Sequence, residues 1–387
     1  MFPEFSVNKI VPLRFAGVDI RLKTTHALFS SHHVDDGTML LLKTLAQRSS
    51  VPISGRVLDA GCGVGPLAVA LKKFRPALKV TARDRLVLAS AYTTENARFN
   101  GVELDVAPGL LLDGTPGPWD LIVSNLPAKA GESVLKDFVT RSLSLLSSGG
   151  LVAVVVVAPL AGWLGDVIGE KGELVYREAA PGYEVFHYRR RLGTELGEPP
   201  FPRHYFRGEI TWKAAGASLY QKTFYGLPNF DALDYRLQVT LPLLEKLKIP
   251  GDCLVWEPVQ GHLAVWALQG MAERSTLFVA GNDVLGLAAA AENCLPKPVT
   301  IIPASYLKDV GIVPVGTVLA QLHPEPEVPW AESTALVLKD LLLPGGCAVV
   351  NGRSTDLTRL LEYRTGLHVV RDERSKGWRA VMLRKPG

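Results

Sequence analysis

Three glycines stand at alternate positions just after an acidic residue in the segment 57–65, Val-Leu-Asp-Ala-Gly-Cys-Gly-Val-Gly. Glycine lets a backbone approach a ligand closely because it has no Cβ, and a turn that opens a helix presents unpaired N–H groups to that ligand. The spacing Gly61-x-Gly63-x-Gly65 differs from the G-x-G-x-x-G of dinucleotide sites. Asp59 would repel a pyrophosphate but suits a cationic or amino-bearing ligand.

Two more polar residues end apolar runs further along the chain. Asp84 ends the run 79–84, and an acid at such a place can accept hydrogen bonds from two ribose hydroxyls. Asn125 ends the run 120–125, and its neutral amide can orient an amino group without protonating it. These two side chains are therefore further candidates for the site.

Strand, turn and helix alternate around these residues. Helical spacing of apolar residues and the stop signals Gly101 and Gly149-Gly150 predict helices at 66–74, 86–100 and 132–146. Apolar runs predict strands at 57–60, 79–84, 120–125 and 151–157. The last run is continuously apolar, which is typical of a strand covered on both faces, so the pattern predicts a doubly wound α/β fold.

The segment 29–150 reappears in weaker form at 230–346. Five pairs of landmarks keep a nearly constant separation of 196 to 199 positions: Asp59 with Glu257, Asp84 with Asp283, Asn96 with Asn293, Asn125 with Gln321, and Gly150 with Gly346. A repeat of this length is a duplicated domain rather than a solenoid unit. We therefore expect a first domain at 1–192, a linker at 193–200 and a second domain at 201–387.

The second copy has lost most of its glycine turn. It reads Glu-Pro-Val-Gln-Gly at 257–261, where Pro258 removes an N–H and Val259 places a bulky side chain in the path of a ligand. Gln321 replaces Asn125, so the amide is longer. The core pattern survives, and we expect a second domain that folds but does not catalyse.

Composition excludes several classes of protein. The 4 cysteines lie far apart and the 8 histidines show no metal-ligand spacing, so neither disulfides nor a metal site is indicated. The apolar run 151–159 is far shorter than the roughly 18 residues of a membrane span. No signal peptide is evident, and we expect a monomeric, cytoplasmic protein without membrane contact. A net charge of +4 permits a nucleic-acid partner without requiring one.

Taken together, the segments 59–65 and 125–128 and the acid Asp84 resemble the class I S-adenosylmethionine-dependent methyltransferases. More narrowly, Phe29 and the segment 35–42 resemble the lead-in of the small-methyltransferase group. That group includes ribosomal-RNA guanine-N2 methyltransferases, some with tandem domains of which one is degenerate. The resemblance implies an α/β chain with two tandem Rossmann-like doubly wound methyltransferase domains, the second degenerate.

The resemblance also implies roles for single residues. Asp84 would hold the ribose of S-adenosylmethionine, Asp113 would lie near the adenine, and Asn125 with Pro127 would form the reacting centre. The residues implied to bind the cofactor are Asp59, Gly61, Gly63, Asp84, Asp113 and Asn125.

The substrate is less well defined. The family's motif is Asn-Pro-Pro followed by Phe or Tyr, whose ring stacks on the target base, whereas this chain has Ala128 at the place of the ring. Stacking on bases tolerates rings of different origin. Candidates for the ring are Phe29, His32, His33 and Trp163. Lys129 could contact a phosphate or be an ordinary surface charge, and the pair His32 and His33 could equally be polar surface.

Basic and aromatic residues interleave in the run 186–191. Arg189, Arg190 and Arg191 could bind RNA phosphates or could be a solvated edge of the linker.

Three hypotheses follow for the function. The first is methylation of a guanine exocyclic amine (N2) in ribosomal RNA by the first domain, with the second domain aiding RNA binding. The second keeps the cofactor but directs the methyl group to a protein side chain, which the missing ring at Ala128 makes credible. The third is an RNA-binding protein without catalysis, against which Asp59, Asp84 and Asn125 stand together in one copy.

Overall fold

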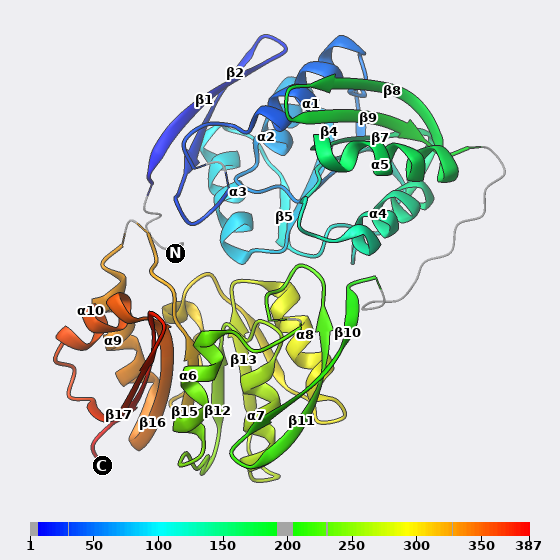
Figure 1. The fold of residues 1–387 in the computed structure, drawn as a ribbon. Coiled ribbons are helices and arrows are strands. Elements are labelled where there is room, and N and C mark those ends of the chain that lie inside the picture. The colour runs from blue at the N-terminus through cyan, green and yellow to red at the C-terminus, as the bar shows by residue number, and fades with distance from the viewer. Residues whose placement is uncertain (1–6, 30, 192–203, 230, 327) are drawn as a thin grey trace. The chain divides into compact units, whose positions relative to one another are not determined.

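The chain divides into two compact units, Met1–Tyr205 and Phe206–Gly387. The computed structural model (Figure 1) describes residues 7–29, 31–191, 204–229, 231–326 and 328–387. The predicted linker, 193–200, and Phe230 lie outside the described residues.

The first unit is built on a seven-stranded sheet in the order β5-β4-β3-β6-β7-β9-β8. Its strands are β3 (Gly55–Ala60), β4 (Leu78–Asp84), β5 (Asp105–Pro108), β6 (Trp119–Asn125), β7 (Leu146–Val157), β8 (Glu173–Ala180) and β9 (Tyr183–Arg189). The first five of these strands pair in parallel, and β9 pairs antiparallel with both β7 and β8.

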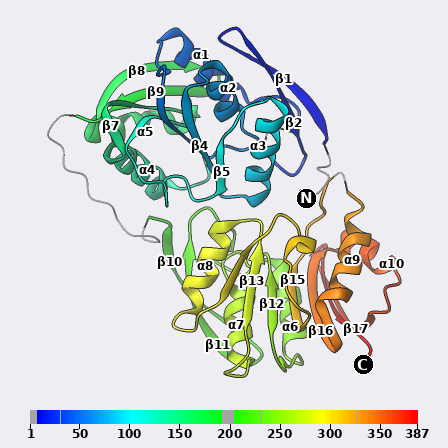
Figure 2. The ribbon, with the colours of Figure 1, turned by 180° about the vertical axis from the view of Figure 1, so that it is seen from behind.

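Helices and a separate hairpin cover this sheet. The hairpin consists of β1 (Lys9–Phe15) and β2 (Val18–Thr24), and the helices are α1 (Asp36–Gln47), α2 (Pro66–Phe74), α3 (Val87–Phe99), α4 (Glu132–Ser144) and α5 (Ala158–Lys171). Apolar side chains of the hairpin, α1 and α2 pack together on one face of the sheet. The hairpin runs beside α3, as the view from behind shows (Figure 2), and β2 contacts that helix.

The second unit repeats the arrangement in the order β14-β13-β12-β15-β16-β18-β17, with its own hairpin. Its strands are β10 (Phe206–Ala214), β11 (Ala217–Phe224), β12 (Cys253–Trp256), β13 (Leu277–Gly281), β14 (Thr300–Pro303), β15 (Val315–Gln321), β16 (Leu342–Arg353), β17 (His368–Ser375) and β18 (Trp378–Arg384). Its helices are α6 (Tyr235–Leu244), α7 (His262–Gly270), α8 (Val284–Cys294), the 3₁₀ turn η1 (Leu307–Asp309), α9 (Trp330–Leu341) and α10 (Ser354–Glu362). The predicted tandem pair of Rossmann-like doubly wound folds is confirmed.

The interpretation of the run 186–191 as a solvated edge of the linker is wrong for its aromatic residues. It lies largely in β9, the antiparallel strand next to β7, where Phe186, His187 and Tyr188 are buried. The alternation of aromatic and basic residues therefore reflects sheet packing, and only the arginines after Tyr188 are exposed.

The strand predicted at 151–157 begins earlier, at Leu146. Gly149 has a φ of 79°, and a Cβ on Gly150 would stand 2.7 Å from the backbone oxygen of Trp119. The two glycines therefore form an irregularity where β7 shifts its register on β6, rather than only ending the preceding helix.

The two sheets have the same strand register, with corresponding residues 196 positions apart in β3 and β12 and in β6 and β15, and 197 apart in β4 and β13. Val57 pairs with Leu121 between β3 and β6, and Cys253 pairs with Thr317 between β12 and β15. This shared register supports the duplication of the domain. It also shows which residues of the two units correspond in the loops that follow the strands.

The pairing of Asp59 with Glu257 is wrong by two positions. In the shared register Val255 stands at the place of Asp59, and Glu257 stands at the place of Gly61. The second unit has therefore lost the acid of the first strand altogether.

The pairing of Asp84 with Asp283 is also wrong by two positions. Val80 and Leu277 pair with corresponding residues of the first strands, so Gly281 stands at the place of Asp84. The Asp283 side chain instead caps α8, where it accepts from the backbone N–H of Leu285 at 3.1 Å.

Asn96 ties three elements of the first unit together. Its side chain accepts from Lys23 N at 2.7 Å, donates to Lys23 O at 3.0 Å and donates to Val64 O at 2.8 Å. It thereby links α3, the hairpin strand β2 and the glycine turn. Asn293 makes the corresponding three bonds in the second unit.

Replacing Asn96 with Ala should lower the free energy of unfolding of the first unit by about 2–4 kcal/mol, because three buried backbone groups lose partners that water cannot replace. Asn100→Ala is the matched control. Asn100 also bonds Arg21 N and O, but at an exposed place, so its loss should cost less than about 1 kcal/mol. Chemical denaturation measures both variants, and equal losses would contradict this account.

Candidate functional site

The glycine turn joins β3 to α2 at the carboxyl edge of the sheet. Gly61, Gly63 and Gly65 have φ angles of 88°, 57° and 88°, values that side-chain-bearing residues rarely adopt. A Cβ built on Gly63 meets nothing within 4 Å, so open space lies in front of the backbone there. The N-terminus of α2, which favours negative charge or hydrogen-bond acceptors, opens from the same turn.

Asp59 is completely buried beneath the turn, with 0% of its surface exposed. Its Oδ2 accepts from the backbone N–H of Ala68 in α2 at 2.9 Å, whereas Oδ1 has no hydrogen-bond partner among the described residues. Burial raises the pKa of Asp59 to about 7. A buried acceptor without a partner is costly, so this oxygen is suited to receive a donor from a ligand.

Asp84 lies at the end of β4 and holds the turn in place. Its Oδ2 accepts from Gly63 N and its Oδ1 from Leu86 N, both at 2.9 Å. Each carboxylate oxygen can accept more than one hydrogen bond, so Asp84 keeps capacity for ligand hydroxyls. Cys62, inside the turn, is buried, and burial together with the charges of Asp84 and Asp59 raises the pKa of its thiol, which suits a packing residue.

Asn125 lies at the end of β6, next to β3 in the sheet. Its amide nitrogen donates to Asp35 Oδ2 at 2.8 Å and to Thr38 Oγ1 at 3.0 Å. Both N–H groups are therefore engaged, and the carbonyl oxygen of the amide is left as the group that faces a ligand.

The residues around Asn125 are exposed to different degrees. Pro127, Ala128 and Lys129 are exposed in the turn between β6 and α4, in which Pro127 O accepts from Ala130 N at 3.0 Å. Phe29 is 74% exposed in the segment between β2 and α1, which is unusual for so large an apolar side chain. Contact of Phe29 or Lys129 with a substrate stays a prediction.

Asp113 directs its carboxylate to a different cluster. Arg141 Nη2 lies 2.7 Å from Asp113 Oδ1, and His204 Nε2 lies 3.6 Å from Oδ2. Burial acts to raise the pKa of Asp113, but hydrogen bonds and charge from His204 and Arg141 lower it overall. Its predicted place beside an adenine has no support in these contacts and stays a prediction.

Arg189, the last residue of β9, and Arg190 and Arg191 after it lie toward the opposite end of the strands from Asn125. Because β9 runs antiparallel to β7, Arg189 lies beside the early part of β7. Asn125 lies beside a later part of the same strand, so the two residues are separated by roughly four residues, or 13 Å, along the strands. Arg189 pairs with Glu173 at 2.7 Å, and Arg191 donates to the backbone oxygens of Gly169 and Gly172. Arg190 is exposed, and phosphate binding by the three stays a prediction.

Sequence reasoning missed several residues of this site. Asp35 and Thr38 surround the amide of Asn125, and the Asp-x-x-Thr spacing of a helix N-cap was the available signal. Tyr183 hydrogen-bonds Asp35 at 2.8 Å, but it comes from the unpredicted strand β9. Leu111, with a φ of 46°, lies 3.8 Å from a Cβ built on Gly61 and carried no sequence signal.

The second unit keeps the shape of the turn but fills it with side chains. Glu257, Val259 and Gly261 have φ angles of 54°, 55° and 93°, close to those of the three glycines. The carboxylate of Glu257 bends back to accept from Asn282 N at 2.8 Å, and burial raises its pKa to about 7. Its carboxyl carbon lies 3.4 Å from a Cβ built on Gly281, the residue at the place of Asp84, so the Glu257 side chain lies where the side chain of Asp84 begins in the first unit.

The reacting centre is also rearranged in the second unit. Gln321 turns its amide nitrogen toward Glu257 O at 3.0 Å. Arg236, at the start of α6, is buried and lies 2.9 Å from the ring nitrogen of His323. The amide that the first unit presents to a ligand is thus directed inward.

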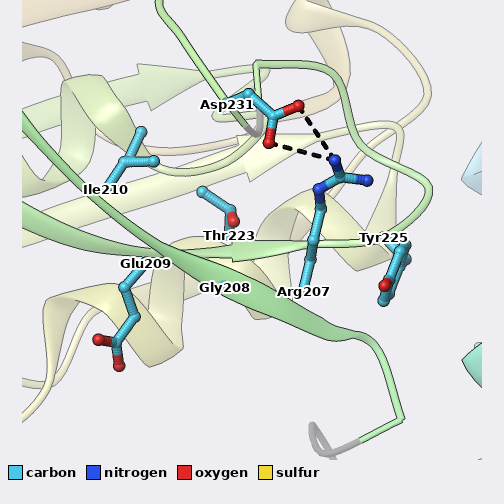
Figure 3. A pocket seen from close by; sticks show the side chains of 7 residues that line it. All are labelled: Arg207, Gly208, Glu209, Ile210, Thr223, Tyr225 and Asp231. Carbon is cyan, nitrogen blue, oxygen red and sulfur yellow. Dashed lines mark hydrogen bonds and ion pairs between the residues drawn. The ribbon is translucent and has the colours of Figure 1, made fainter.

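A cleft of about 480 Å³ lies in the second unit, at the start of its hairpin. Arg207 points to Asp231 at 3.0 Å, and its guanidinium lies 5.5 Å from the ring centre of Tyr225 (Figure 3). Glu209 adds another negative charge to the lining. Acids outnumber bases in this cleft, so it is poorly suited to phosphate.

Metal and membrane sites were searched in the described part of the chain. No group of three or more His, Cys, Asp or Glu side chains there is placed to hold a metal ion. None of the described helices is long and apolar enough to cross a membrane. The cysteines Cys62, Cys253, Cys294 and Cys347 are buried and unpaired.

A family model matches most of the first unit. Residues 19–167 match the methyltransferase small domain. The ribosomal RNA small subunit methyltransferase C of Shewanella sp. (strain MR-4) is 33% identical over 167 residues, 42% of this chain and 47% of that protein. The protein of the same name from Sodalis glossinidius is 30% identical over 183 residues, covering 45% and 50%. The chain thus spans half or less of these curated relatives.

The fold also resembles a solved structure over its full length. The T. thermophilus 16S rRNA N2 G1207 methyltransferase, solved in complex with AdoMet and guanosine, matches with a TM-score of 0.68. The match covers 98% of this chain and 99% of that chain at 16% identity, which is a likeness of fold.

The raised pKa of Asp59 makes a prediction about stability and pH. The native protein holds a proton on Asp59 between about pH 4, the ordinary value of an Asp, and pH 7, whereas the unfolded chain does not. This proton therefore contributes fully to the free energy of unfolding below about pH 4. Its contribution falls by roughly 1 kcal/mol per pH unit as the pH rises to 7. Asp59→Asn should remove this slope from the unfolding of the first unit.

Chemical denaturation at several pH values from about 4 to 8 measures the slope. Glu257→Gln is the matched control, since Glu257 has a similarly raised pKa in the second unit. An Asp59→Asn protein that keeps the slope in its first unit would contradict the burial of an uncompensated carboxyl.

Proposed function

We propose that this protein transfers a methyl group from S-adenosylmethionine to a guanine exocyclic amine (N2) of small-subunit ribosomal RNA, since residues 19–167 match the methyltransferase small domain. The observation that carries the proposal is the Asn125 amide, whose nitrogen is bound to Asp35 and Thr38 so that its oxygen is left as an acceptor for a ligand. An enzyme with this substrate would act in the cytoplasm, where ribosomes are assembled. We further propose that it acts as a monomer.

The residues of the turn fit S-adenosylmethionine. Oδ1 of Asp59 lacks a partner and suits the ammonium group of the methionine end, and Asp84 has capacity for the ribose hydroxyls. The open space at Gly63 leaves room for the ligand against the backbone. When bound, the cofactor supplies a methyl group on a sulfonium, which needs no metal ion to become transferable.

The chain's own residues would position the nucleophile. A guanine N2 amine carries two hydrogens, and the Asn125 oxygen would accept one of them without protonating the nitrogen, while a backbone carbonyl near Pro127 accepts the other. Methyl transfer to nitrogen is an in-line displacement, so holding the amine at attack distance supplies most of what the protein can contribute.

Two exposed residues would contact the RNA near this centre. Phe29 would stack on the flipped base in place of the ring that Ala128 lacks, since an exposed aromatic face accepts any base. Lys129 would pair with a phosphate, and the basic run Arg189, Arg190 and Arg191 would bind phosphates further along the RNA.

The second unit would contribute to RNA binding rather than to catalysis. Glu257 and Val259 fill the turn there, and Gln321 faces inward. We expect these side chains to keep both a cofactor and a target amine out of that unit.

A protein side chain is the second candidate substrate, because the ring expected at Ala128 is missing. Tritiated methyl from the cofactor, added with purified protein to an extract of a strain that lacks it, separates the candidates. The proposal expects label in small-subunit ribosomal RNA, on guanine. Label in protein alone would favour the second candidate, and label in neither would refute both.

Gly63→Val tests the cofactor site. We expect it to weaken binding of S-adenosylmethionine about 10- to 100-fold, since overpacking costs about 1–3 kcal/mol. The protein should still fold, because Val259 adopts the same backbone conformation in the second unit. Calorimetry measures the affinity, and Glu257→Ala, which changes only the second unit, should leave it unchanged. Equal effects of the two changes would overturn the assignment of the site to the first unit.

A further inference from the structure

Asp35, which is buried, and Tyr183, which is half-buried, form a support for the reacting centre. Asp35 Oδ2 accepts from the Asn125 amide at 2.8 Å, and Asp35 Oδ1 accepts from the Tyr183 hydroxyl at 2.8 Å. Asp35 is only 7% exposed, and Thr38, the second acceptor of the Asn125 amide, is 4% exposed. Hydrogen bonds to a carboxylate in so dry a place are strong.

This support decides which way the Asn125 amide points. A carboxylate only accepts, so it must face the NH₂ group of the amide and not its oxygen. With both N–H groups bound to Asp35 and Thr38, no described residue donates to Oδ1. The amide cannot flip without setting its oxygen against a carboxylate, and its acceptor therefore stays directed toward the ligand.

Tyr183 in turn fixes Asp35. The hydrogen bond to Asp35, followed by burial, raises the pKa of Tyr183 to about 12, so the hydroxyl stays a donor at every physiological pH. The ring packs against Gly37, where an added Cβ would stand 2.7 Å from Tyr183 Cδ1. Gly37 thus leaves the room that this ring requires at the start of α1.

Comparison with the second unit shows which part of this arrangement the fold requires. Asp234 caps α6 as Asp35 caps α1, with Leu237 N donating to it at 2.9 Å. The amide of Gln321, however, bonds to the backbone of Glu257 instead of to the capping acid. The fold therefore needs the cap but not the link from the cap to the amide.

We propose that Asp35 and Tyr183 are positioning residues for methyl transfer, which hold the Asn125 amide with its oxygen toward the target amine. This inference rests on the proposed function of the site. Neither residue touches the reacting atoms in this account; Asp35 acts through Asn125, and Tyr183 acts through Asp35.

Asp35→Ser is the main test. Serine is a good N-cap and keeps the bond to Thr38 N, so α1 stays intact, but its side chain is too short to hold Asn125. We expect kcat to fall about 10- to 100-fold through misplacement of the amine, with the cofactor Kd unchanged and the melting temperature lowered by only a few degrees through the lost hydrogen bonds. Asp35→Asn, which retains an acceptor oxygen, should recover part of this loss, and Tyr183→Phe should lower kcat about 2- to 10-fold.

Asp234→Ser is the matched control, because it shortens the same cap in the second unit and should leave kcat unchanged. A wild-type kcat in Asp35→Ser, or an equal fall in Asp234→Ser, would overturn the inference. A fall in kcat that comes only with a markedly lower melting temperature and is not recovered by Asp35→Asn would also overturn it, since that result indicates a structural role.

A second measurement is independent of catalysis. The two side-chain amide protons of Asn125 should exchange slowly with solvent in the wild type and at least about 10-fold faster in Asp35→Ser, as seen by NMR of ¹⁵N-labelled protein. Equal exchange rates would overturn the inference even if methyl transfer is observed. If wild-type protein transfers no methyl group and binds no cofactor, the proposed function fails, and the exchange rates still decide whether Asp35 holds the amide.

Discussion

The left-handed backbone of the turn after the first strand is the constraint on which the rest of the structure depends. It reverses the chain from β3 into α2 within a few residues. Asp84 accepts from its N–H at Gly63, and Asn96 donates to its carbonyl at Val64. Gly61, Gly63 and Gly65 adopt this conformation without strain. The second unit keeps the same conformation with Glu257 and Val259, although non-glycine residues there cost about 1 kcal/mol or more each. The fold thus requires the shape of the turn, whereas ligand binding requires its lack of side chains.

Buried polar groups explain why the site is precise as well as stable. Asn125, Asp35 and Tyr183 come from a parallel strand, a helix N-cap and an antiparallel strand, and each bonds the next. Beneath the glycine turn, Oδ1 of Asp59 has no hydrogen-bond partner among the described residues. A buried acceptor without a partner lowers the free energy of unfolding. Such a loss of stability is common at sites that bind a ligand.

The parallel part of each sheet was predictable because its strands are continuous apolar runs ended by glycine or polar residues, as at Asp84 and Asn125. The edge strands were not predictable. In β8 the apolar Leu174 and Val175 are both exposed and the later side chains alternate between exposed and half-buried, and β9 looks like a basic aromatic run. Tyr183 was missed for this reason, because no local pattern connects it with an acid 148 positions earlier.

Comparison of the two copies by sequence identified the degenerate unit but misaligned its acids. Glu257 looked like the counterpart of Asp59 because both are acids next to a strand, and only the pairing of strands shows that it replaces Gly61. The error matters chemically. An acid beneath the turn can serve a ligand, whereas the acid in the turn of the second unit is already bonded to Asn282 N.

The central claim is that one unit binds the cofactor and the other, with the same backbone, excludes it. Titration calorimetry of the full chain with S-adenosylmethionine counts the sites directly. The account predicts one site per chain. Two sites per chain, or one site that survives the change of Asp59 and Asp84 together to Ala, would contradict it.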